Sequence, residues 1–82
     1  MVAKHKTYTL NDILAKAAFE AYGGLIPEGE LRISPVYLSW TNEIILGRLK
    51  RAGIIRHWKQ LLTEKTSGNM RAYEVVMESK FL

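Results

Sequence analysis

The most informative segment of the sequence is NEIILGRLKRAGII, residues 42–55. Four of its apolar residues share one face at the helical spacing: Ile45, Leu46, Leu49 and Ala52. Gly53 suits the left-handed position that ends a helix, and Ile54 can contact Leu49 to close it. The segment therefore predicts a helix that ends at Ala52, with a buried face and a strand beginning just after it.

The opposite face of this helix is predicted to be exposed and basic. Its members are Trp40, Glu43, Ile44, Gly47 and Arg51, with Arg48 and Lys50 at the flanks. Residues 41–60 hold five Lys or Arg against one acidic residue, whereas residues 11–40 have a net charge of −2, in a chain of net charge +4. Such a basic segment is typical of a surface that meets a polyanion, and a solvated helix face is the alternative.

Composition excludes several classes of protein. At 82 residues the chain is expected to form one domain. It has no cysteine and only two histidines, His5 and His57, so we predict no metal site and no cofactor. The acidic residues are scattered and no glycine-rich phosphate loop is present, so we do not expect an enzyme. The absence of a signal-peptide or membrane-spanning run predicts a cytoplasmic protein with no membrane contact.

The first half of the chain is predicted to hold two helices and a short strand. Thr9 suits the N-cap of a first helix that ends at Gly23 and Gly24, and a brief strand is expected over residues 31–33. Ser34-Pro35 indicates the start of a second helix through about Ser39. Either Ser39 or Thr41 could cap the third helix. A single helix over residues 36–52 is the alternative.

The last third predicts a β-hairpin. Residues 54–64 and 70–78 favour strands, and residues 65–69 form a polar turn between them. Residues 1–8 form a basic arm before the domain at 9–78, and the apolar tail at 79–82 is expected to pack on the first helix or on a second subunit. Trp40 and Trp58 are predicted to lie in the core.

The order of these elements, with NEIILGRLKRAGII at its centre, resembles the winged helix-turn-helix superfamily of DNA-binding proteins over residues 9–78. The resemblance implies an α+β fold of three helices with a C-terminal wing of two to three antiparallel strands. It also implies that the third helix enters the major groove while the hairpin contacts backbone or minor groove.

We therefore expect a sequence-specific double-stranded DNA-binding protein, a transcriptional regulator that acts as a homodimer. A protein-interaction winged helix without DNA readout is the alternative. A stand-alone domain of this size suits a virus, a plasmid or an archaeon, and no effector is indicated. The predicted DNA-binding residues are Thr41, Asn42, Ile44, Gly47, Arg48, Lys50, Arg51, Lys65, Thr66, Ser67, Asn69 and Arg71.

Four of these positions leave alternatives open. Arg48 and Arg51 could grip guanine edges, although phosphate contacts are favoured. Gly47 could admit a close DNA backbone or a neighbouring side chain. Ile44 could meet thymine methyl groups or a protein partner.

Overall fold

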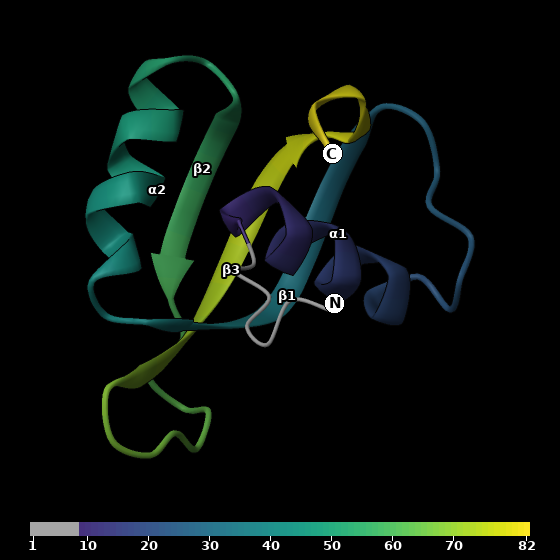
Figure 1. Ribbon diagram of the computed structural model, residues 1–82. Coiled ribbons are helices and arrows are strands. Elements are labelled where there is room, and N and C mark those ends of the chain that lie inside the picture. The colour runs from purple at the N-terminus through teal and green to yellow at the C-terminus, as the bar shows by residue number, and fades with distance from the viewer. Residues whose placement is uncertain (1–8) are drawn as a thin grey trace, which may run out of the picture.

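The computed structural model describes residues 9–82, so the predicted arm at 1–8 lies outside the described residues (Figure 1). The fold is α+β. Its elements are α1 (Leu10–Ala21), β1 (Glu30–Ser39), α2 (Asn42–Arg51), β2 (Ile55–Gln60), β3 (Met70–Glu78) and a short 3-10 helix, η1 (Ser79–Phe81).

The strands form one antiparallel sheet in the order β1-β3-β2, so the last strand of the chain lies in the middle. Figure 1 shows α1 across β1 and α2 alongside β2. Leu14 of α1 and Leu46 of α2 belong to the same buried core as Tyr73 and Val75 of β3. Both helices therefore cover the same face of the sheet.

The prediction of three helices is wrong, because residues 34–39 are not a helix. They continue β1, which is ten residues long and pairs with β3 along its length. The single helix proposed for residues 36–52 is wrong for the same reason. The fold therefore has two α-helices and a three-stranded sheet, and its strand β1 takes the place of the expected second helix.

A bulge in β1 explains this error. Leu31 and Ile33 point into the core, and after a register shift Val36 and Leu38 do so. The buried positions thus change from odd to even residue numbers across Ser34-Pro35, which form a cis peptide within the strand. A sequence in which the alternation breaks at Ser-Pro looks like two elements, although the backbone is one bent strand.

The first helix is confirmed with its predicted caps. Thr9 Oγ1 accepts a hydrogen bond from the Asp12 backbone N–H at 3.1 Å, and Asp12 Oδ2 accepts one from the Thr9 N–H at 3.0 Å. This reciprocal pair is a capping box. After Ala21 the chain leaves the helix, and Gly23 and Gly24 both have positive φ.

The hairpin of β2 and β3 is also confirmed, but β2 ends at Gln60 and a nine-residue loop, 61–69, follows it. The tail packs on the first helix: Asn11 Nδ2 donates to the Phe81 carbonyl oxygen at 3.0 Å, and Phe81 and Leu82 pack against the core.

Candidate nucleic-acid interface

The outer side of α2 presents one open stripe of side chains. Ile44, Gly47 and Arg51 are spaced by three and four residues, which places them in line along α2, and Trp40 lies in the turn just before the helix begins. Trp40 is 51% exposed and Ile44 is 61% exposed. The half of the stripe nearer the start of α2 is therefore apolar, and the half nearer its end is cationic.

Gly47 lies at the centre of this stripe without a packing role. Its φ is not positive, and a Cβ at this position would meet nothing within 4 Å beyond its two chain neighbours and the adjacent backbone of α2 among the described residues. No neighbouring side chain fills the gap, so the second interpretation of Gly47 given above is wrong. Glycine within a helix costs about 1 kcal/mol relative to alanine. The fold itself does not require that cost.

The inner side of α2 is fixed to the middle of the sheet. Leu46 is fully buried, and the Tyr73 hydroxyl of β3 donates to Glu43 Oε2 at 2.9 Å. The Tyr73 ring also meets Trp58 edge to face, with centroids 5.8 Å apart. These contacts hold α2 in one orientation and so direct its outer stripe away from the core.

Four predicted positions differ from the structure. Ala52, which was predicted on the buried face of α2, is exposed. Trp40 is half-exposed rather than buried, because the chain turns there between β1 and α2. Glu43 points inward to Tyr73, although it was predicted on the outer face. Ile45 was predicted to be buried and is 39% exposed. The buried side of α2 is rotated from Ile45 toward Glu43, because Tyr73 provides a hydrogen-bond donor there.

The cations of α2 differ from two of the arginines of the sheet. Arg32 pairs with Glu74 at 2.7 Å, and Arg56 pairs with Glu30 at 2.9 Å and with Glu78 at 2.7 Å. Among residues 9–82, no ion pair involves the α2 cations Arg48, Lys50 and Arg51. Five other Lys or Arg residues of this region also form no ion pair, but Arg48, Lys50 and Arg51 lie within four consecutive residues, so they form the densest group of such cations among residues 9–82.

The loop 61–69 adjoins the other end of α2. The Trp40 backbone N–H donates to the Asn69 carbonyl oxygen at 2.9 Å, which brings Asn69 next to Thr41 and Asn42. Thr41 is exposed and its hydroxyl lies 3.1 Å from Ser39 Oγ, whereas Asn42 is half-buried. The structure thus brings together the predicted residues at the start of α2 and at the end of the loop.

The remaining loop residues have unequal roles. Lys65, Thr66 and Ser67 are exposed, and their side chains form no hydrogen bond or ion pair with α2 in the described part of the chain. Arg71 is half-buried, and its Nη1 donates to the carbonyl oxygens of Gly68 at 3.2 Å and Met70 at 2.9 Å. Arg71 therefore holds the loop, and Lys65 is its exposed cation.

The pair of Tyr73 and Glu43 was missed by sequence reasoning. The two residues are 30 positions apart, and neither the periodicity of α2 nor that of β3 indicates that they meet. By contrast, the prediction that Trp58 lies at the core is confirmed. Trp58 packs against the core, whereas its neighbours His57 and Lys59 are exposed.

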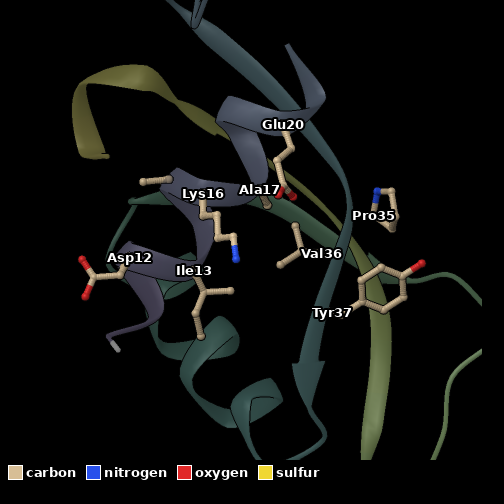
Figure 2. A pocket seen from close by; sticks show the side chains of 9 residues that line it. Asp12, Ile13, Lys16, Ala17, Glu20, Pro35, Val36 and Tyr37 are labelled. Carbon is tan, nitrogen blue, oxygen red and sulfur yellow. The ribbon is translucent and has the colours of Figure 1, made fainter. Parts of the chain in front are cut away.

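A separate groove of about 530 Å³ lies between α1 and β1 (Figure 2). Asp12, Lys16 and Glu20 follow one another along its helical side, and Pro35 and Tyr37 belong to its strand side. The groove is open and its charges are mixed. Across residues 9–82 no three His, Cys, Asp or Glu side chains lie close enough together to hold a metal ion.

No helix within the described residues has both the length and the apolar character needed to span a membrane.

The α2 stripe, with the adjoining loop, is the surface on which most of the predicted site residues lie. Comparison of the chain with protein-family models, curated proteins and solved structures gives no match.

Proposed function

We propose that this chain binds double-stranded DNA through the outer stripe of α2, with the loop 61–69 as a second contact. The observation that carries this proposal is the group of cations Arg48, Lys50 and Arg51, which form no ion pair within residues 9–82, on a helix whose outer side is open. When clustered Lys and Arg neutralise phosphates, the counterions condensed on those phosphates are released. This release strongly favours binding of a polyanion.

The shape of the surface agrees with this partner. A helix of ten residues is about 15 Å long, and the major groove of B-DNA is about 12 Å wide, so it admits one such helix. In Figure 1, α2 lies at one side of the molecule, next to β2, and α1 lies across β1. The outer stripe can therefore approach a duplex without interference from α1.

The parts of the surface have different roles in this proposal. Arg48, Lys50 and Arg51 contact phosphates or guanine edges from the end of α2. Thr41 and Asn42 lie at its start. Four short or basic residues of the loop, Lys65, Thr66, Ser67 and Asn69, donate to the sugar-phosphate backbone.

One copy of so small a domain provides few base contacts, so we propose that two copies bind a symmetric site as a homodimer and regulate transcription there. Selection of duplexes from a random pool, with the number of chains per duplex measured by sedimentation, tests this. A palindromic consensus bound by two chains is expected, and an asymmetric consensus bound by one chain would refute the dimer.

A pair of matched double variants tests the role of α2. Arg48→Ala with Arg51→Ala lowers the net charge from +4 to +2, and so does Lys16→Ala with Lys80→Ala on other elements. We expect the α2 variant to bind duplex DNA at least about tenfold more weakly. Its plot of log affinity against log salt should be less steep by about two, since two phosphate contacts are lost. The control variant should keep most of the wild-type affinity and most of the wild-type salt dependence.

Fluorescence anisotropy across a salt series measures both quantities, and circular dichroism checks the fold. Equal affinities for the two variants would show that α2 is not the binding surface. A wild-type chain that fails to bind DNA at low salt would refute the proposal as a whole.

The protein-interaction alternative rests on the exposed apolar half of the stripe, Trp40 and Ile44. Large exposed apolar residues near one another often mark a contact with another protein. If this alternative holds, Trp40→Ala should abolish binding of a protein partner while the double variant of Arg48 and Arg51 retains it.

A further inference from the structure

We infer that Ile44 and Gly47 give α2 a specificity for thymine, with Ile44 contacting the C5 methyl group in the major groove and Gly47 allowing the helix backbone close to the bases. This inference rests on the proposed binding of duplex DNA. It assigns a base class to the stripe, beyond the phosphate and guanine contacts of its cations.

Gly47 provides the first step. It has an ordinary helical backbone and open space where a Cβ would be, so alanine would fit the fold and stabilise the helix. The folded chain by itself gives no reason for glycine at this position. A partner that touches the helix backbone does give one, because a methyl group at position 47 would hold that partner away.

Ile44 provides the second step. Its side chain is 61% exposed, three residues before Gly47 on the same stripe. The cations of α2 favour a polyanion as the occupant of this face. Within the major groove, the apolar group available to a branched aliphatic side chain is the methyl group of thymine.

The spacing along the stripe provides the third step. Ile44 and Arg51 are seven residues apart, which is about 10.5 Å along the helix axis. Successive base pairs are about 3.4 Å apart, so these two side chains reach positions about three base pairs from each other. Ile44 can therefore contact a thymine while Arg51 contacts a phosphate or a guanine about three base pairs away, and Gly47 lies between these two residues.

The test uses a duplex selected from a random pool by the wild-type chain, made once with thymine and once with deoxyuridine, which lacks only the methyl group. We expect the wild-type chain to bind the deoxyuridine duplex about fourfold more weakly, as loss of one buried methyl group predicts. Ile44→Ala should bind the two duplexes equally. Ile45→Ala is the matched control, because Ile45 is adjacent and lies off the stripe, and it should keep the fourfold difference.

Gly47→Ala completes the test. We expect its melting temperature to rise and its affinity for the thymine duplex to fall about tenfold, comparable with the loss of one base contact. An unchanged affinity would overturn the role of Gly47, because it would show that a methyl group at position 47 does not hold the duplex away from the helix backbone.

The outcomes separate this inference from the proposed function. Binding of duplex DNA without discrimination between thymine and deoxyuridine, or without a selected consensus, overturns the inference and leaves the proposed function standing. Discrimination that persists in Ile44→Ala assigns the contact to another residue and also overturns it. Absence of all duplex binding removes the proposed function together with the inference.

Discussion

The Tyr73 side chain links the core to α2. It is fully buried, stacks edge to face on Trp58 and donates its hydroxyl proton to Glu43. Burial, then the hydrogen bond to Glu43 and the negative charge of that carboxylate, together raise the pKa of Tyr73 from 10.0 to about 12, although the positive charge of Arg71 lowers it in part. The folded chain thus holds this proton more tightly than the unfolded chain does.

This pKa predicts how stability depends on alkaline pH. Below pH 10 the Tyr73 hydroxyl is protonated in both states, and its contribution to stability is complete. Between pH 10 and about 12 the unfolded chain releases the proton while the folded chain keeps it, so the free energy of unfolding falls. Tyr73→Phe should show a smaller fall over this range, and at neutral pH it should be less stable by about 1–2 kcal/mol.

Denaturant titrations between pH 7 and 12 measure both effects. Tyr37→Phe is the control, because Tyr37 is half-exposed and its hydroxyl lies 3.4 Å from Glu64 Oε2. If the Tyr73 and Tyr37 variants lose stability equally at neutral pH, the contact with Glu43 does not anchor α2.

Single residues also show the limit of sequence reasoning. Thr9 was identified as an N-cap because the capping pattern acts within four residues of chain, and Asp12 completes it in the structure. Ser34-Pro35 has the same local appearance as a helix start, yet β3 pairs with both sides of it. Trp40 was assigned to the core on its size. Its exposure depends on where β1 ends, which local sequence does not specify.

At the scale of elements, α1 and the end of α2 were predictable, whereas β1 was not. Gly53 has a φ of +82°, and the Ile54 N–H donates to the Leu49 carbonyl oxygen at 2.9 Å, so the predicted closure of α2 is confirmed. The N-cap of the helix was left between Ser39 and Thr41, and it is Thr41, although its side chain makes no capping hydrogen bond. The cations on its outer side follow from helical spacing alone. The inward rotation of Glu43 depends on β3 and could not be predicted.

Two glycines of this one element should respond in opposite ways to alanine. At Gly53 the left-handed backbone disfavours a side chain, and we expect Gly53→Ala to lose about 1–2 kcal/mol of stability. At Gly47 the ordinary helical backbone predicts a gain of up to about 1 kcal/mol. Thermal unfolding of the two variants measures both changes, and a loss at Gly47 would mean that the helix is strained there.

At the scale of the whole molecule, the sheet has one face covered by helices and one face lined with ion pairs. The central partner on this second face is Arg56 of β2, which binds Glu30 of β1 and Glu78 of β3 and so spans all three strands. The hairpin and the core position of Trp58 were predictable from sequence. The contacts between β1 and the strands far from it in sequence were not, and they contradict the three-helix prediction.

Arg56→Ala tests whether charge or its placement matters. Arg56 and Glu30 are more than half exposed, so the ion pairs should contribute no more than about 1 kcal/mol, and less at high salt. We expect DNA affinity to change less than in Arg48→Ala, although each variant removes one positive charge. Anisotropy at a single salt concentration compares the two. Equal losses would mean that overall charge, rather than the α2 stripe, governs binding.

The strand order described above has a consequence for how the chain is made. On the ribosome, β1 and β2 emerge before β3, and in the finished sheet β1 and β2 do not pair with each other. Until residues 70–78 emerge, both strands lack the partner that satisfies their backbone groups. The sheet is thus completed when β3 inserts between β1 and β2. Before β3 emerges, the nascent chain is most prone to aggregation.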